Sequence, residues 1–133
     1  MNLLESNFDM GILNKISYDI IGAAYRVHSV LGPGLMESTY EVCLEYELIK
    51  MGYKVERQKS LPINYNGVLL DAGYRIDLLV EDSLIVELKS VSEMIPLFKA
   101  QLMTYLKLSG LTLGLLMNFN VTDMKKGITR LVM

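Results

Sequence analysis

The sequence predicts an α/β fold in which a mixed central β-sheet is flanked by helices, with elements in the order α-α-β-β-β-β-α-β-β. Apolar residues recur at helical spacing near the start of the chain and again near residue 100, and short apolar runs bounded by turn residues lie between and after them. The length of 133 residues with 51% apolar residues allows one domain with a real core. We expect residues 15–133 to form this domain and residues 1–14 to be a loose N-terminal segment.

Two helices are expected first. Apolar side chains recur every three or four residues over residues 15–31, and the Gly-Pro-Gly segment at 32–34 ends that helix. A second helix is expected over residues 36–51, with Gly52 as its stop. Its predicted apolar face consists of Tyr40, Leu44, Leu48 and Met51.

The strands are expected where the spacing of apolar residues is no longer helical. They are expected over residues 53–58, 61–65, 68–70, 74–80 and 84–90, and Asn66-Gly67 is typical of a hairpin turn. A third helix is expected over residues 96–108, because Pro96 is tolerated in a first helical turn and Gly110 can end the helix. Strands over residues 111–119 and 128–133 complete the chain.

The composition excludes several classes of protein. One cysteine, Cys43, and one histidine, His28, exclude an internal disulfide framework, a cysteine zinc cluster and multi-histidine metal sites. The net charge of -2 argues against a non-specific nucleic-acid coat protein, so any nucleic-acid role must come from a local site. We expect a cytoplasmic protein with no membrane role, since no signal-peptide pattern and no apolar run of about 18 residues is present.

Two neighbouring strands carry charges within apolar segments. Alternation places Arg75, Asp77 and Leu79 on one face of the first strand, opposite Tyr74, Ile76, Leu78 and Val80. In the next strand Ile85, Glu87 and Lys89 share one face, and Leu84, Val86 and Leu88 share the other. A short turn could therefore bring Asp77, Glu87 and Lys89 together. They would form either a cross-strand charge ladder or a hard-oxygen site for Mg²⁺ or Mn²⁺ with an adjacent lysine.

A third acid is a candidate on the second helix. Glu37 lies one turn before Tyr40 on the inward face, whereas Glu41 and Glu45 are predicted to point elsewhere. Glu37 could complete a metal shell, or it could simply stabilise the helix N-terminus.

The third helix carries a polar pair. Gln101 and Tyr105 are four residues apart and share a face, so they could bind a phosphate oxygen or fix Lys89. The alternative is an ordinary amphipathic helix face.

These residues together resemble a known family. The stretch GLMESTY at 34–40 carries the GxxExxY pattern, and the resemblance to the GxxExxY protein family continues through VHSVLGPGLMESTYE, YRIDLLVEDSLIVELKSV, AQLMTYLKLSG and GLLMNFN. That family is placed in the PD-(D/E)XK nuclease superfamily, so the resemblance implies a restriction-endonuclease-like core. Asp77 with Glu87-Leu88-Lys89 looks like the D…ExK core, and Glu37 looks like the acid of the first core helix. Gln101 and Tyr105 look like the QxxxY motif of the RecB-like and lambda-exonuclease-like branches.

The resemblance implies metal-dependent hydrolysis of phosphodiester bonds in DNA or RNA. Asp77, Glu87 and the Leu88 carbonyl would bind one Mg²⁺ or Mn²⁺, and Glu37 would bind it directly, through water, or hold a second ion. Lys89 would position the attacking water and stabilise the transition state. Gln101 and Tyr105 would orient Lys89 or grip a phosphate.

Basic side chains could contact the substrate backbone. The candidates are Lys54, Arg57, Lys59 and Lys99, with Arg75 nearer the site, although such a charge run is also typical of a solvated strand edge. His28 could contact a phosphate or metal, or could be half-buried and bonded to the backbone.

Two other classes of function stay open. The chain could be a non-catalytic module that keeps the nuclease fold and binds nucleic acid or protein. It could also be an assembly protein whose apolar terminal strands pair with other chains. A homodimer fits any of these hypotheses, and a protein partner could supply the nucleic-acid affinity that the acidic balance disfavours.

Overall fold

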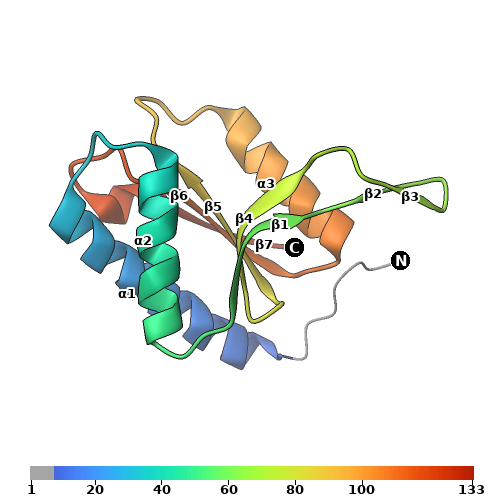
Figure 1. Ribbon diagram of the computed structural model, residues 1–133, viewed down its shortest axis with the longest axis horizontal. Coiled ribbons are helices and arrows are strands. Elements are labelled where there is room, and N and C mark those ends of the chain that lie inside the picture. Colours follow the sequence, from blue (N-terminus) through green and yellow to red (C-terminus); the bar gives the residue numbers. More distant parts are fainter. Residues whose placement is uncertain (1–7) are drawn as a thin grey trace.

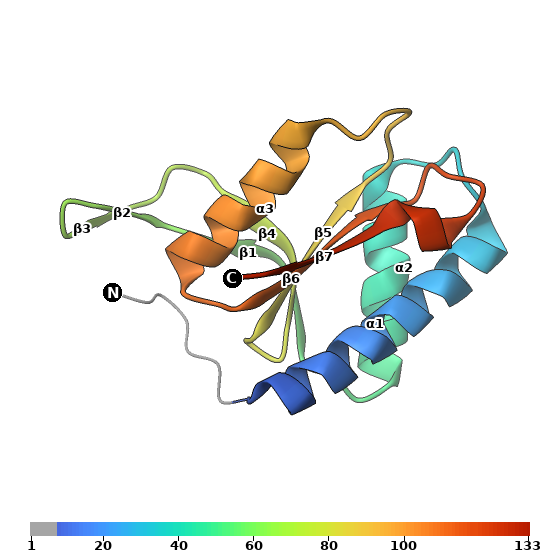
Figure 2. The same ribbon diagram turned by 180° about the vertical axis from the view of Figure 1, so that it is seen from behind.

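The computed structural model describes residues 8–133, which form three layers. Helices α1 (Met10–Leu31) and α2 (Glu37–Lys50) cover one face of a five-stranded sheet, and α3 (Pro96–Ser109) covers the other (Figures 1 and 2). A 3-10 turn, η1 (Met124–Gly127), precedes the last strand. The predicted α/β class is therefore confirmed, but five strands lie between α2 and α3 instead of the four in the predicted element order.

The first helix begins five residues earlier than expected. The Asp9 side chain accepts a hydrogen bond from the Ile12 amide at 2.9 Å and so caps the helix N-terminus. Leu13 is buried in the core, which holds this first turn against the sheet. The expectation of a loose segment is thus wrong for residues 10–14, and its first seven residues lie outside the described part of the chain.

The other two helices match the expected positions closely. Tyr40, Leu44 and Leu48 of α2 are fully buried, as predicted, but Met51 is 40% exposed because it follows the last helical residue. Helix α3 ends at Gly110, whose φ of 77° is the left-handed conformation that glycine adopts without strain.

The main sheet has the strand order β1-β4-β5-β6-β7. Its strands are β1 (Val55–Ser60), β4 (Arg75–Val80), β5 (Leu84–Lys89), β6 (Leu113–Asn118) and β7 (Ile128–Val132). Among these five described strands only β5 and β6 pair in parallel, and α3 makes the crossover between them. Strands β2 (Ile63–Tyr65) and β3 (Val68–Leu70) form a separate hairpin about Asn66-Gly67, which extends away from the main sheet in Figure 1.

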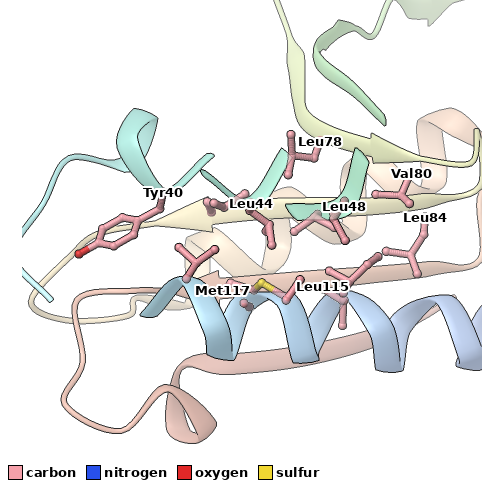
Figure 3. Close-up of a cluster of buried hydrophobic side chains, with 14 of the residues drawn as sticks. Tyr40, Leu44, Leu48, Leu78, Val80, Leu84, Leu115 and Met117 are labelled. Atoms are coloured by element: carbon pink, nitrogen blue, oxygen red, sulfur yellow. The ribbon is translucent and has the colours of Figure 1, made fainter. Parts of the chain in front are cut away.

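The core consists of two apolar clusters, one on each face of the sheet. Figure 3 shows part of the larger one, between the sheet and helices α1 and α2. Leu84, Val86 and Leu88 all belong to it, as the predicted alternation requires. In β4 the prediction fails at one residue, because Ile76 lies in the α3 cluster while Leu78 lies in the α1–α2 cluster. The regular alternation of faces therefore breaks at Asp77.

The two terminal strands differ in exposure. Strand β6 is buried along its whole length between β5 and β7, so the hypothesis that it is an exposed edge is wrong. Strand β7 does form an edge of the sheet, and β1 forms the opposite edge. Within residues 8–133, every helix is too short or too polar to cross a bilayer.

Candidate active site

The candidate site lies where strands β4 and β5 separate. Their backbone pairing runs from Val80↔Leu84 to Leu78↔Val86, and the next opposed residues are Asp77 and Glu87. The Asp77 amide donates to Glu87 Oε2 at 2.8 Å, and the Leu88 amide donates to Asp77 Oδ2 at 2.9 Å. Each carboxylate thus accepts a main-chain hydrogen bond from the other strand, and the predicted meeting of Asp77 and Glu87 is confirmed.

Strand β1 adds a residue, Gln58, that no sequence pattern indicates. Gln58 lies between the paired positions Arg57↔Leu78 and Lys59↔Ile76, so it is opposite Asp77. Its φ of 56° is uncommon for a residue other than glycine. The Gln58 amide nitrogen donates to Asp77 Oδ1 at 3.2 Å and to a second carboxylate oxygen, Glu41 Oε1, at 2.9 Å. Gln58 therefore links α2 to the carboxylates of the sheet.

Helix α2 brings a different acid to the site from the one predicted. Glu41 is only 6% exposed and bonded to Gln58, whereas Glu37 is exposed in the first turn. The expectation that Glu41 points elsewhere is wrong, and so is the inward burial of Glu37. The two residues are one turn apart and share a side of the helix, but only Glu41 lies far enough along it to reach the sheet. Burial is the main cause that raises the pKa of Glu41, and the negative charge of Glu37 is still close enough to add to it.

Lys89 lies between the carboxylates and helix α3. Its Nζ is 4.5 Å from the centroid of the Phe98 ring, a cation–π contact. Its positive charge also lowers the pKa values of Asp77 and Glu87, opposing the larger effect of their burial. The predicted grouping of Asp77, Glu87 and Lys89 is therefore present.

The polar pair on α3 faces the same site. The Gln101 amide nitrogen donates to the Tyr105 hydroxyl at 3.1 Å, so the predicted i, i+4 contact forms. Tyr105 is only 4% exposed, and burial followed by the negative charge of Glu87 raises the pKa of its hydroxyl. Tyr105 is thus both part of the α3 packing cluster and a neighbour of Glu87, and Gln101 is bonded to it.

The acids of the site lie in a largely buried environment, which disfavours their negatively charged form. Burial, and then the charge of Asp77, raises the pKa of Glu87 to about 8. Burial also raises the pKa of Asp77 above its usual range, although hydrogen bonds from Leu88 and Gln58 oppose it. The pKa of Glu41 is raised by burial in the same way. A proton or a cation near these three acids would relieve their repulsion.

The chemistry of the donor set fits a divalent cation. Within residues 8–133, no three acidic, histidine or cysteine side chains are arranged as a ready metal cluster. The carboxylates of Glu87 and Asp77 accept hydrogen bonds from backbone amides. Mg²⁺ commonly needs only one or two carboxylates, and it completes its shell with water and substrate phosphate oxygens. Asp77 and Glu87 can provide those oxygens, and the raised pKa of Glu87 reflects negative charge that a cation would neutralise.

Most of the predicted basic contacts are already engaged with acids. The nearest acids lie in the same segments or on adjacent elements, so short ion pairs form: Lys54 with Asp82 (2.7 Å), Lys59 with Glu56 (2.9 Å), Arg57 with Glu45 (3.3 Å) and Arg75 with Asp71 (3.6 Å). Lys99 differs from these four, because it is exposed on α3 and has no ion pair with any residue of the described chain. The predicted basic run is thus a set of paired charges, and Arg57 also lies 3.9 Å from the buried Glu41 of the site.

His28 is bonded to the backbone. Its Nε2 is 2.7 Å from the Val121 carbonyl oxygen, and its ring lies 6.5 Å from the ring of Phe119. Of the two alternatives for this residue, the structure therefore supports the backbone-bonded one.

Tyr40 fixes the loop that leads into α2. Its hydroxyl donates to the Gly32 carbonyl at 2.6 Å and accepts from the Leu35 amide at 3.2 Å. The Leu35 carbonyl in turn accepts from Ser90 Oγ at 2.5 Å, just after Lys89 at the end of β5. The tyrosine of the GxxExxY pattern is thus a structural residue that anchors α2 beside the site.

The fold and the site define an α/β protein that carries the D…ExK side chains, Asp77, Glu87 and Lys89, where strands β4 and β5 separate. A model of the PD-(D/E)XK nuclease superfamily matches residues 14–131, nearly the whole chain. The chain therefore belongs to the PD-(D/E)XK nuclease superfamily. A search of curated proteins and a search of solved structures each gave no significant match.

Proposed function

We propose that this protein is a metal-dependent nuclease that hydrolyses phosphodiester bonds of DNA or RNA. The observation that carries the proposal is the reciprocal bonding of Asp77 and Glu87 with Lys89 beside them. Membership of the superfamily, which suggests a nuclease-like function, supports it. We also assign the chain to the GxxExxY family and to a branch that carries the QxxxY motif, on the basis of residues 34–40 and the Gln101–Tyr105 contact.

The acids divide into two roles in this proposal. Asp77, Glu87 and the Leu88 carbonyl would hold Mg²⁺ or Mn²⁺, and Glu41 would support them through Gln58. Glu37, exposed one turn earlier, would act only through water or on a second ion. When bound, the cation supplies Lewis-acid polarisation of the scissile phosphate.

The remaining side chains act on water and on charge. Lys89 would orient the attacking water and offset the negative charge that develops on the phosphate. The Phe98 ring beneath the Lys89 Nζ limits where this ammonium group can move. Gln101 and Tyr105 would hold a phosphate oxygen next to Glu87, because their polar groups already meet there.

The surface charge of the protein affects how tightly it can bind nucleic acid. Four of the predicted basic contacts are neutralised by acids, and the net charge is -2, so we expect weak independent affinity for a polyanion. A protein partner or a second copy of this chain would then supply part of the grip. The same observation favours the second candidate function, a non-catalytic binding module that retains the nuclease fold.

A nuclease assay with a matched pair of variants tests the proposal. Purified parent, Glu87→Gln and Glu47→Gln would be incubated with single- and double-stranded DNA and RNA, in Mn²⁺ or in EDTA. Glu47→Gln is the control because it makes the same chemical change at a glutamate outside the site. Glu47 lies on α2, as Glu41 does, but pairs with Arg26 of α1. We expect cleavage by the parent and by Glu47→Gln in Mn²⁺ only, and a loss of at least 100-fold in Glu87→Gln. Equal cleavage by Glu87→Gln and the parent would exclude the assignment. Failure of the parent to bind Mn²⁺ in a calorimetric titration would favour the binding module.

A further inference from the structure

A cavity of about 360 Å³ opens beside the carboxylates, between α3 and the residue that precedes β4. Aromatic rings from Tyr74, Phe98 and Tyr105 line it, together with Ala100. Two polar side chains, Gln101 and Thr104, also face it. Apolar walls with a few polar groups are typical of a pocket for a flat organic ligand.

The cavity shares residues with the candidate active site. The Phe98 ring that lines it lies under the Lys89 ammonium group, and the Gln101–Tyr105 pair lies beside Glu87. Tyr74 contacts Tyr105 edge to face, with ring centroids 6.1 Å apart, yet Tyr74 stays 43% exposed. A ligand in the cavity could therefore stack on Tyr74 while an attached phosphate reached Lys89.

The charge on α3 suits a polyanion. The helix has two lysines, Lys99 and Lys107, and no acidic residue between Pro96 and Ser109. Both lysines are exposed, and neither forms an ion pair within residues 8–133. No acidic side chain of the described chain lines the cavity. This flank is thus free to bind phosphates, unlike the paired basic residues of β1.

We propose that the cavity takes an unstacked nucleobase, so that the substrate is single-stranded nucleic acid or a frayed end. The proposal rests on the proposed nuclease function and names the substrate class of the same site. Bases inside a duplex are stacked on their neighbours and cannot enter a side pocket unless they are extruded. Stacking on aromatic rings accepts any base, because every base has a π-face.

A pair of tryptophan substitutions tests the pocket. Ala100→Trp fills the cavity from an exposed helical position, and Val30→Trp is the matched control at an 82% exposed position on α1, across the sheet. Binding of a fluorescently labelled single-stranded oligonucleotide and of a blunt duplex of the same sequence would be followed by anisotropy in EDTA. Circular dichroism would verify that both variants fold.

We expect the parent to bind the single strand more tightly than the duplex. Ala100→Trp should weaken single-strand binding by about tenfold or more, roughly the loss of one base-stacking contact, and Val30→Trp should leave it unchanged. Folded Ala100→Trp binding as tightly as the parent would overturn the inference, as would equal affinity for the duplex or no single-strand binding by the parent. The readout needs neither metal nor cleavage, so it can succeed or fail independently of the Glu87→Gln assay.

Discussion

Asp77 and Glu87 each hold the other's strand at the point where the main-chain pairing of β4 and β5 stops. The Asp77 amide binds the Glu87 carboxylate at 2.8 Å, and the Asp77 carboxylate binds the Leu88 amide at 2.9 Å. Two backbone amides that would otherwise lack partners at the division of the sheet are thereby satisfied. The same contacts fix the direction of both carboxylates, so the acids that hold the sheet together are also the acids placed for chemistry.

The stability of the protein should fall as the pH rises, because of Glu87. Its pKa is raised from an ordinary 4.5 to about 8, so the folded state holds the proton more tightly than the unfolded chain does. The contribution of Glu87 to the free energy of unfolding is therefore complete below about pH 4.5 and is lost as the pH rises through 8. Between these limits we expect a loss on the order of 4 kcal/mol, measured by urea unfolding in EDTA at several pH values.

Glu87→Gln should show a much flatter profile over the same range, because its side chain does not titrate. The control is Glu47→Gln, whose half-buried carboxylate pairs with Arg26 away from the site, and it should keep the slope of the parent. A Glu87→Gln profile as steep as that of the parent would mean that other groups cause the dependence.

The sequence was informative about the site where two strands joined by a short turn decide the geometry. Asp77, Glu87 and Lys89 could be predicted because strand alternation and a short turn determine which residues meet. Glu41 could not, because a helical period gives the angle of a side chain but not how far along the helix the sheet begins. Gln58 gave no signal either, since its role depends on a positive φ and on a strand that is distant in the sequence.

The same reasoning explains the results for the fold. Element types and most boundaries followed from periodicity and turn residues, and the strand bounds agree within two residues. The position of β6 inside the sheet depends on long-range pairing with β5 and β7, which apolar character alone does not reveal. The face of Ile76 differs from the prediction because the alternation breaks at Asp77, where the main-chain pairing of β4 with β5 has ended and the Asp77 amide binds the Glu87 carboxylate.

Replacing Glu41 should affect the site more than replacing Glu37. Burial and the charge of Asp77 are the main causes that raise the pKa of Glu87, and the charge of Glu41 adds to them, so Glu41→Gln should make the apo protein more stable at pH 8. The same change should weaken Mn²⁺ binding roughly tenfold, as the loss of a supporting acid typically does. Unfolding by urea and calorimetric titration with Mn²⁺ measure the two effects.

Glu37→Gln is the comparison, because it changes an exposed acid one turn away. It should alter both quantities less than Glu41→Gln. A larger loss of Mn²⁺ affinity in Glu37→Gln would restore Glu37 as the principal acid of the helix.

Lys89→Met should abolish most cleavage while the protein stays folded. The methionine side chain can still pack on Phe98, but the positive charge near the carboxylates is lost. We expect a fall in cleavage rate of about 100-fold or more, the usual effect of removing a group that stabilises charge in the transition state. Lys125→Met, at an exposed position in η1, is the control for the loss of one lysine. Cleavage by Lys89→Met within a few fold of the parent would exclude Lys89 from the chemistry.

Tyr40→Phe should destabilise the protein through the loop between α1 and α2. The buried hydroxyl donates to the Gly32 carbonyl at 2.6 Å and accepts from the Leu35 amide at 3.2 Å, so its removal leaves two backbone groups without this partner. The ring still stacks on Phe119, with centroids 4.6 Å apart, and the packing should survive. We expect a loss of about 1–3 kcal/mol in the free energy of unfolding, measured by urea denaturation. Tyr46→Phe, on the same helix but 64% exposed, should change stability by less than about 0.5 kcal/mol. Equal effects of the two substitutions would show that the tyrosine of the GxxExxY pattern contributes through its ring alone.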